Sequence, residues 1–177
     1  MKPETLSSKT IYSGRIFDIR LDSIREGDIE YTREIIAHKG SAVIVPVFDD
    51  GTIALVRQYR HSTGKYLLEI PAGGVEEGES FAQAAARELE EEIGVRAAKV
   101  EPLVEFYVSP GFLDEKMYLF LATGLTASTQ NLDPDEIVTI ERYSIEQLIG
   151  MIGTREIEDA KTIIGILFAR DRLVPKE

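Results

Sequence analysis

The sequence predicts an α+β fold, a sandwich of layers in which helices pack against a mixed sheet. Three observations support this prediction. Short segments with alternating or continuous apolar residues recur through most of the chain, one amphipathic helix interrupts them, and two further helical segments follow near the end. With 177 residues, of which 44% are hydrophobic, the chain is long enough to bury a full core.

The strands are predicted from apolar periodicity and turn residues. At the N-terminus, residues 10–24 and 29–37 alternate enough to form an antiparallel hairpin around the turn at Glu26, Gly27 and Asp28. Residues 41–48 are almost continuously apolar, which is typical of a buried strand, and an Asp-Asp-Gly turn follows them. Further strands are expected at residues 52–58, 67–70, 99–107, 116–122 and 137–143.

The central helix is expected to begin near Ser80, since Ser80 and Gln83 form a capping-box pattern, and to end at Gly94. Helical periodicity gathers one apolar face from Phe81, Ala82, Ala85, Ala86, Leu89 and Ile93. Glu88 and Glu92 lie on the border of this face, so both are expected to be half buried. Two closing helices are expected at residues 144–152, with Ser144 as the cap, and at residues 158–172.

Acidic residues crowd the central helix in a way that opposes its stability. Glu90, Glu91 and Glu92 lie at the negative end of the helix dipole. Glu88 and Glu92 are like charges one turn apart, and Arg87 is the only basic residue of the segment. Each such repulsion costs roughly 0.3 to 1 kcal/mol. Carboxylates facing a cleft would bind Mg²⁺ or Mn²⁺, which turns repulsion into metal affinity; the alternative is a solvated acidic face.

The segment around this helix resembles the Nudix box, GX5EX7REUXEEXGU, in which U is a bulky aliphatic residue. The positions that match it, without a departure, are Gly73, Glu79, Arg87, Glu88, Leu89, Glu91, Glu92, Gly94 and Val95. The resemblance to the Nudix hydrolase family implies hydrolysis of a diphosphate linked to another moiety. It also implies an α/β/α sandwich with a mixed sheet between helices.

The same resemblance implies roles for individual residues. Glu88 and Glu92 would bind two or more divalent ions, Mg²⁺ or Mn²⁺, with Glu91 and the Ala72 carbonyl as further ligands. Arg87 would orient the glutamates by a salt bridge, which agrees with its place one turn before Glu91. Two other acids near this centre, Glu69 and Glu79, are open between a supporting role and simple solvation.

The composition narrows the partners and the location. A net charge of −11 argues against nucleic acid, whose binding depends on cationic side chains. A small anionic substrate would instead need a local cationic patch, for which the candidates are Arg33, Arg57, Arg60 and Lys65. The N-terminus lacks the apolar stretch of a signal peptide and no apolar run is long enough for a membrane span, so we expect a cytoplasmic protein. The absence of cysteine does not bear on the location, but it excludes disulfides, thiolate nucleophiles and zinc–thiolate sites. His38 and His61 are expected to be surface or hydrogen-bonding residues rather than metal ligands.

A second informative segment is the turn Ser109, Pro110 and Gly111, with Glu115 shortly after it. Pro110 lies sixteen residues after Gly94. Within the Nudix family this spacing looks like the ADP-ribose pyrophosphatase subgroup, which implies that Glu115 is a general base or ligand and that Gly111 contacts the substrate. The implied reaction is metal-dependent hydrolysis of ADP-ribose, or a related nucleoside diphosphate sugar, to AMP and ribose 5-phosphate.

The resemblance also implies a homodimer formed by N-terminal strands at residues 1–38, followed by a Nudix domain at residues 39–177. Ile16 and Phe17 are open between a dimer or substrate contact and an ordinary core role. Two other functions stay open. The same box is able to serve a nucleoside triphosphate, a dinucleoside polyphosphate or another nucleotide sugar, and the chain is also compatible with a nucleotide-sensing module without turnover.

Overall fold

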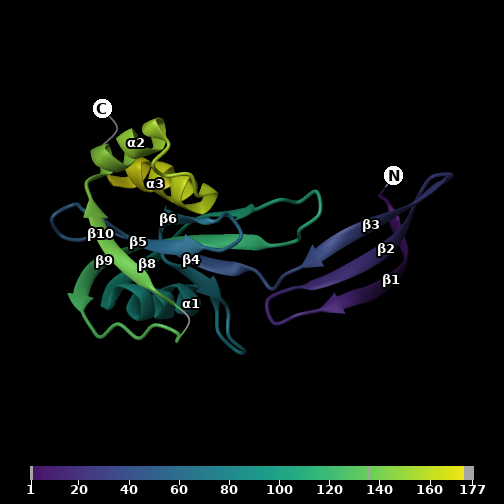
Figure 1. Ribbon diagram of the computed structural model, residues 1–177, viewed down its shortest axis with the longest axis horizontal. Coiled ribbons are helices and arrows are strands. Elements are labelled where there is room, and N and C mark those ends of the chain that lie inside the picture. The colour runs from purple at the N-terminus through teal and green to yellow at the C-terminus, as the bar shows by residue number, and fades with distance from the viewer. Residues whose placement is uncertain (1, 135, 174–177) are drawn as a thin grey trace. The chain divides into compact units, whose positions relative to one another are not determined.

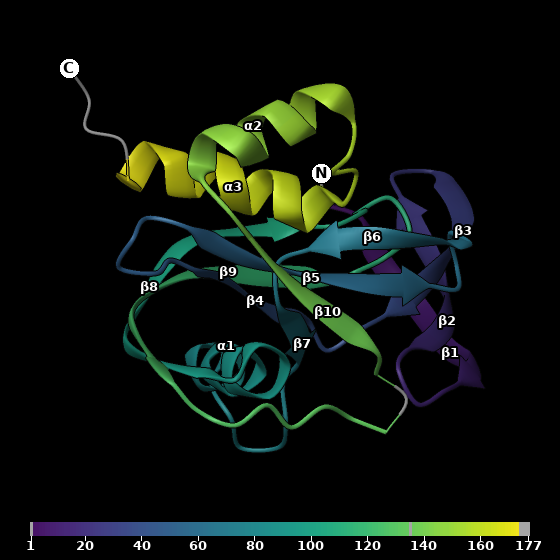
Figure 2. The ribbon, with the colours of Figure 1, turned by 60° about the vertical axis from the view of Figure 1, so that its left-hand side comes forward.

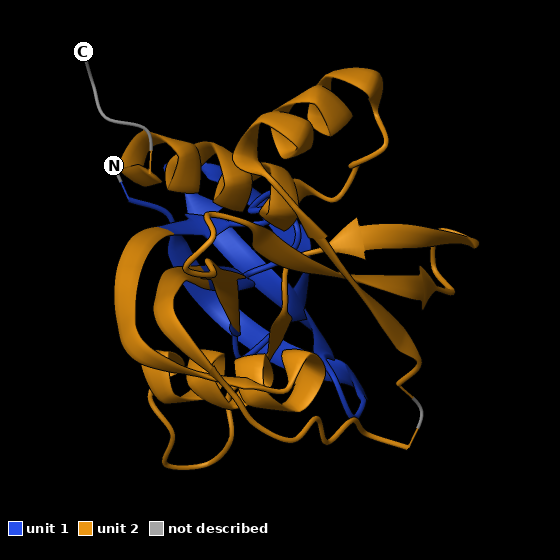
Figure 3. Ribbon diagram, turned by 90° about the vertical axis from the view of Figure 1, so that its left-hand side faces the viewer, with its two compact units in different colours: residues 1–41, 105–117 blue, residues 42–104, 118–177 orange. Residues whose placement is uncertain are grey.

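The computed structural model describes residues 2–134 and 136–173 and has the α+β composition that the sequence predicts (Figure 1). The chain divides into two compact units (Figure 3). Unit 1 comprises Met1–Ser41 and Glu105–Met117, and unit 2 comprises Ala42–Val104 and Tyr118–Glu177. No helix in the described part of the chain is long and apolar enough to cross a membrane.

Unit 1 contains a three-stranded antiparallel sheet formed by β1 (Glu4–Ser13), β2 (Asp18–Glu26) and β3 (Ile29–Ala37). The hairpin between β2 and β3 is the one that the turn residues predicted. The single strand expected at residues 10–24 is wrong, because the chain reverses at Gly14, whose N–H donates to the Phe17 carbonyl at 3.1 Å. Apolar alternation continues through both strands, so the pattern does not reveal this turn.

The sheet of unit 1 buries little of its own surface. Every residue of β1 is exposed, and Asp22 on β2, where Ser8 donates to it at 2.5 Å, is only 6% exposed. The loop after β8 attaches to the end of β3 through its backbone. The Ile36 N–H donates to the Phe112 carbonyl at 2.8 Å, and the Asp114 N–H donates to the Ile36 carbonyl at 3.1 Å. This attachment fixes the loop that carries the Pro-Gly turn.

Unit 2 contains all or most of each strand of two further sheets, with strand orders β10-β5-β6 and β7-β4-β9-β8. Their strands are β4 (Ser41–Pro46), β5 (Ile53–Arg60), β6 (Lys65–Glu69), β7 (Ala72–Gly74), β8 (Val95–Tyr107), β9 (Lys116–Ala127) and β10 (Val138–Tyr143). Helix α1 (Phe81–Glu88) lies on one side of these strands, and α2 (Ile145–Thr154) and α3 (Ala160–Leu173) lie on the other (Figure 2). The predicted strands of this part and both closing helices are confirmed, with shifts at their ends.

The helix that carries the box begins after Ser80 and ends at Gly94, as predicted, but its last turn is not a regular α-helix. Ser80 caps α1 in a complete capping box with Gln83, as Ser144 does for α2 with Gln147. The regular α-helix stops at Glu88, and Leu89–Ile93 forms a π-helical turn, η1, that ends at Gly94 with φ of 72°. Such turns occur frequently at functional sites. The extra residue in this turn changes how Glu92 is presented relative to Glu88.

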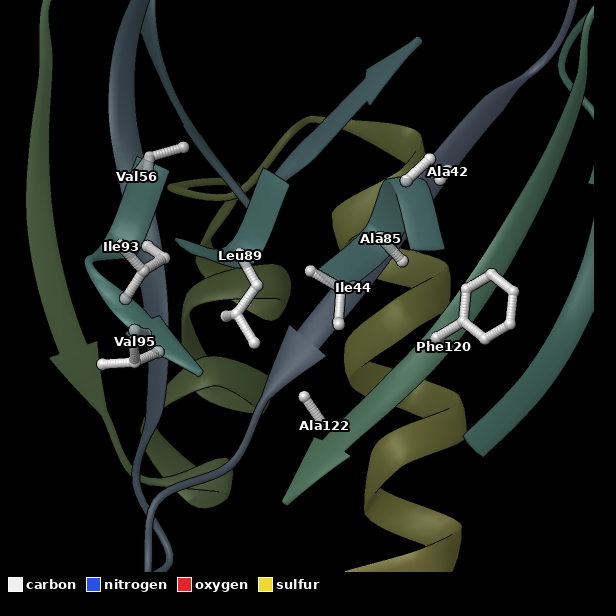
Figure 4. Packing of buried hydrophobic residues seen from close by; sticks show 11 residues of the cluster. Ala42, Ile44, Val56, Ala85, Leu89, Ile93, Val95, Phe120 and Ala122 are labelled. Carbon is white, nitrogen blue, oxygen red and sulfur yellow. The ribbon is translucent and has the colours of Figure 1, made fainter. Parts of the chain in front are cut away.

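The core packs one face of the box helix against the sheet (Figure 4). Leu89, Ala84 and Ala85 are completely buried, with Ile44 and Val56 in the same cluster. The predicted apolar face is therefore confirmed at its centre. It is wrong at its edge, because Ala82 is exposed while Ala84 is buried. The core fixes α1 and η1 directly, so it also fixes the carboxylates that they carry.

Candidate active site

The backbone of β7 comes very close to the first glutamate of the helix. A Cβ atom added at Gly73 would lie 2.0 Å from Glu88 Oε1, far inside van der Waals contact. Only glycine lets the strand and the carboxylate approach each other in this way. Glu88 is 9% exposed as a result, more deeply buried than the half-buried state expected from the sequence.

Arg87 connects the acidic residues of the box. Its Nη1 donates to Glu88 Oε1 at 2.7 Å and to Glu91 Oε2 at 2.8 Å, which is the ion pair expected from their helical spacing. Its Nη2 donates to the Gly74 carbonyl at 2.8 Å, and Glu79 accepts from both Nε and Nη2 at 3.2 Å. Glu79 therefore supports the site, and one guanidinium fixes three carboxylates and a strand.

Glu92 is a buried carboxyl group, and one of its two oxygens has no hydrogen-bond partner among the described residues. It is 4% exposed, and its Oε2 is the one buried side-chain oxygen within residues 2–134 and 136–173 that has no hydrogen-bond partner. Burial raises the pKa of Glu92 to about 8, and the charges of Glu88 and Glu136 add to the rise. Burial likewise raises the pKa of Glu88. Buried groups of this kind require a compensating interaction.

The metal-free protein should lose stability as the pH rises from 5 to 8. The pKa of Glu92 is higher in the folded state than in the unfolded state, so the folded protein binds the proton more tightly. The stabilisation is fully present below the unfolded pKa and is lost as the pH rises through about 8. Urea unfolding in EDTA at several pH values measures this slope. Glu92→Gln should flatten it, and an equal slope in both proteins would contradict the assignment.

Glu136 is a further acidic residue near Glu88 and Glu92, and no sequence pattern indicated it. It lies in the loop before β10, it is half-buried, and its charge raises the pKa of both Glu88 and Glu92. Its carboxylate therefore lies near theirs. The signal in the sequence was an acidic run at residues 133–136, which has no periodicity and reads as an ordinary polar loop.

The donor set suits a divalent cation. Glu88 and Glu92 offer buried carboxylate oxygens, and the orphaned Oε2 of Glu92 provides a hard, anionic ligand, as Mg²⁺ and Mn²⁺ prefer. No group of three or more Asp, Glu, His or Cys side chains in the described ranges has the spacing of a complete metal cage. The hydrogen bonds from Arg87 to the Glu88 and Glu91 carboxylates explain part of this spacing, since they hold both carboxylates at the guanidinium.

Gly73→Ala should weaken metal binding by roughly 10- to 100-fold, the usual effect of disturbing the support of a metal ligand. The new methyl group displaces the end of the flexible Glu88 side chain rather than the backbone, so we expect the fold to persist. Titration calorimetry with Mn²⁺ measures the affinity. Gly74→Ala is the matched control, because nothing lies within 4 Å of a Cβ there. An equal loss of Mn²⁺ affinity in both variants would show that the effect comes from backbone flexibility and not from contact with Glu88.

Of the predicted cationic residues in unit 2, Arg60 is the one directed towards the box. Its Nε and Nη2 donate to Glu69 at 2.7 Å each, and the charge of Glu92 acts on it. Arg57 pairs instead with Glu141 at 2.5 Å, and Lys65 pairs with Glu158. Of these two arginines, Arg60 is the one whose charge acts on Glu92, and substrate binding by either of them stays a prediction.

In unit 1, the Glu115 carboxylate accepts a hydrogen bond from a serine and lies near a histidine. Its Oε1 accepts from the Ser41 hydroxyl at 2.7 Å and lies 3.6 Å from His38 Nδ1. His38 Nδ1 also accepts from the Gly40 N–H at 3.0 Å, so this histidine is a hydrogen-bonding residue, as expected. His61 packs edge-on against Tyr59 and is exposed.

Two other predicted residues of unit 1, Arg33 and Gly111, line the same pocket. The volume of this pocket is about 290 Å³. Two exposed aromatic residues, Tyr107 and Phe112, line it as well, together with Arg20, Ile35, Pro110, Leu113 and Asp114. The pocket thus combines cationic groups with aromatic rings.

Known proteins resemble the chain over almost its full length. An ADP-ribose pyrophosphatase of Bacillus subtilis (strain 168) is 35% identical over 95% of this chain and 92% of its own. A methanol dehydrogenase activator of Bacillus methanolicus is 34% identical over 93% of this chain and 91% of its own. An ADP-ribose pyrophosphatase of Mycobacterium tuberculosis (strain ATCC 25618 / H37Rv) is 38% identical over 93% of this chain and 81% of its own.

A solved structure and a family description agree with these relatives. The crystal structure of an ADP compounds hydrolase superposes with a TM-score of 0.87 at 24% identity, covering 98% of this chain and 95% of that one. The α/β/α sandwich expected from the sequence is thereby confirmed. The model of the NUDIX domain matches residues 38–164, which include every position of the box. This chain belongs to the NUDIX domain family.

Proposed function

We propose that this protein hydrolyses the diphosphate bond of ADP-ribose, or of a related nucleoside diphosphate sugar, to AMP and ribose 5-phosphate. The observation that carries the proposal is the buried Glu92, whose Oε2 has no hydrogen-bond partner in the part of the chain that the structure describes, beside Glu88 in a complete box. The choice of substrate is supported by relatives named ADP-ribose pyrophosphatase that match more than nine-tenths of this chain. The Pro110–Gly111 turn agrees with it.

The metal ligands are Glu88, Glu92, Glu91 and the Ala72 carbonyl, for two or more Mg²⁺ or Mn²⁺ ions. When bound, the ions supply positive charge to the non-bridging phosphate oxygens and acidify the attacking water. Arg87 holds Glu88 and Glu91 in place, and Gly73 leaves room for the Glu88 carboxylate.

Phosphate and nucleotide contacts fall to the cationic and aromatic groups. Arg60 keeps its guanidinium fixed on Glu69 and offers its charge to the diphosphate, with Arg57 as a more distant cation. Arg33 and Gly111 contact the substrate from their pocket, where a cation beside exposed rings suits a nucleotide.

The proton of the attacking water is taken by a glutamate, for which Glu115 is the first candidate. It lies on the loop of the Pro-Gly turn, where its hydrogen bond from Ser41 would hold it in one orientation. Glu136 is the second candidate, because its carboxylate acts on both Glu88 and Glu92.

The enzyme acts as a cytoplasmic homodimer through residues 1–38, without nucleic acid or membrane partners. The sheet of unit 1 and the turn between β1 and β2 support self-association, since they expose the apolar side chains of Leu6, Ile11, Tyr12, Ile16, Phe17 and Ile29. Apolar exposure on that scale is typical of a surface that meets another protein. The net charge of −11 opposes contact with nucleic acid or anionic lipid.

A hydrolysis panel with Mg²⁺ and Mn²⁺ tests the proposal directly. The substrates are ADP-ribose, another nucleotide sugar, a nucleoside triphosphate and a dinucleoside polyphosphate, with products separated by chromatography. We expect AMP and ribose 5-phosphate from ADP-ribose at the highest kcat/KM. Faster cleavage of a triphosphate would overturn the substrate, and binding without turnover of any compound would favour a sensing module.

A further inference from the structure

A buried cluster of charges lies at the end of β6 and the start of α3. Glu69 is 1% exposed and Lys161 is 8% exposed. Glu69 accepts from Arg60 through both oxygens, and Lys161 donates to Glu69 Oε2 while lying 3.1 Å from Asp159. We name Arg60, Glu69, Asp159 and Lys161 the lysine cluster. A buried lysine is costly, so its charge must be compensated here.

The lysine cluster adjoins the box glutamates. Strand β5, which ends at Arg60, contacts η1, which carries Glu92. The positive charges of Lys161 and Arg60 both act on the Glu92 carboxyl. Glu92 and Asp159 act in turn on Arg60. The cluster is therefore part of the electrostatic environment in which an anionic substrate would bind.

The formal charges of the cluster balance only when Lys161 is counted. Arg60 and Lys161 contribute two positive charges, and Glu69 and Asp159 contribute two negative charges. Without Lys161 the carboxylates outnumber the cations, and the bidentate pair with Glu69 cancels the charge of Arg60. Lys161 donates to Glu69 Oε2, the oxygen that also accepts from Arg60 Nη2, so two cations share the charge of this carboxylate. It can then orient Arg60 without cancelling the guanidinium charge.

Lys161 is not needed to attach α3 to β6, because its neighbour Thr162 makes this attachment. The Thr162 hydroxyl accepts from the Ile70 N–H at 2.9 Å and donates to Asp159 at 2.6 Å, so it attaches the start of α3 to the end of β6. Thr162 is completely buried and uncharged. It provides a control that separates attachment of the helix from balance of charge.

We propose that Lys161 is a positioning residue for substrate phosphate: it balances Glu69, so that Arg60 is held in place while its charge remains available to a diphosphate. This inference rests on the proposed function, since it takes the substrate to be a diphosphate. The binding chemistry is that of an anion with at least two adjacent phosphoryl groups, which meets Arg60 beside the box glutamates.

The test uses Lys161→Gln, which keeps a hydrogen-bond donor for Glu69 and removes the charge. We expect the Kd for inorganic pyrophosphate, measured by calorimetry with Mg²⁺, to rise about tenfold, as removal of one nearby charge predicts. KM for ADP-ribose should rise in parallel, with kcat within a few-fold of wild type. The double variant Lys161→Gln with Asp159→Asn removes one charge of each sign, keeps the bidentate pair of Arg60 with Glu69, and should return Kd to within about threefold of wild type.

Thr162→Val should lower the melting temperature and leave the Kd for pyrophosphate unchanged. An unchanged Kd in Lys161→Gln would overturn the inference, as would a double variant that binds no better than the single one. If Lys161→Gln does not fold, the double variant alone tests the inference. Its Kd for pyrophosphate should be close to that of the wild type, and a tenfold higher Kd would contradict the proposed charge balance. A wild type that ignores ADP-ribose but binds pyrophosphate refutes the proposed function only, since the pyrophosphate measurements still test Lys161.

Discussion

Replacing Glu92 by glutamine should reduce kcat for ADP-ribose by about 10³ or more, because loss of a metal ligand removes several kcal/mol of transition-state stabilisation. The metal-free variant should be at least as stable as the wild type above pH 7. Its amide has the size of the carboxyl group but no charge to bury, and the Oε2 of Glu92 has no hydrogen bond to lose within the described ranges. Steady-state kinetics and urea unfolding in EDTA measure the two effects.

Glu90→Gln is the matched control, with the same substitution in the same π turn. Glu90 faces outwards, where it accepts from Arg96 at 2.8 Å and from Ser128 at 2.6 Å. We expect its kcat to stay within a few-fold of wild type, since it takes no part in the buried centre. Activity of Glu92→Gln near that of Glu90→Gln would refute the metal-ligand assignment.

Removal of the general base should reduce kcat by roughly 10² to 10⁴, with a much smaller change in KM. Glu115→Gln and Glu136→Gln test the two candidates. Glu115 belongs to unit 1 and accepts a hydrogen bond from Ser41, while Glu136 belongs to unit 2 and acts on Glu88 and Glu92. We expect one variant to show this loss and the other to lose less than about tenfold.

The pH profile distinguishes a base from a support. A variant that has lost its base should also lose the acidic limb of the kcat profile, whereas one that has lost a support should keep the limb at a lower rate. Ser41→Ala is informative for Glu115, because it removes the 2.7 Å hydrogen bond and leaves the carboxylate. Two variants that both retain full kcat would show that another acid accepts the proton.

The part of the site that the sequence predicted well is the part with regular spacing. A capping residue at Ser80, an αL glycine at Gly94 and helical periodicity between them place Glu88 and Glu92 on one side of a buried helix. Local rules determine these features, so one sequence contains enough information. The π turn is different, because it depends on contacts from a distant loop that no local pattern encodes.

The features that the sequence did not predict depend on tertiary pairing. Arg57 and Arg60 look alike in the sequence, but the pairing of β5 with β6 and β10 sends Arg60 to Glu69 and Arg57 to Glu141. Glu136 lies in an irregular loop, where hydrophobic periodicity and secondary-structure propensity do not predict which carboxylates lie nearby. The turn at Gly14 escaped notice because alternation continues on both sides of it.

The π turn has a consequence for how freely the chain can change its length. Gln130 donates from its side chain to the Glu92 carbonyl at 2.7 Å, and the Asn131 N–H donates to the Glu91 carbonyl at 3.0 Å. The connection from β9 to β10 therefore donates hydrogen bonds to carbonyl groups at the end of the π turn. Glu136 lies in the same connection, six residues after Gln130. An insertion or deletion between these points would shift an anchor of the helix and an acid of the site in one step. Surface loops usually tolerate changes of length. In this loop, a change of length would also require compensating changes at Gln130, which binds the π turn, and at Glu136, whose charge acts on Glu88 and Glu92.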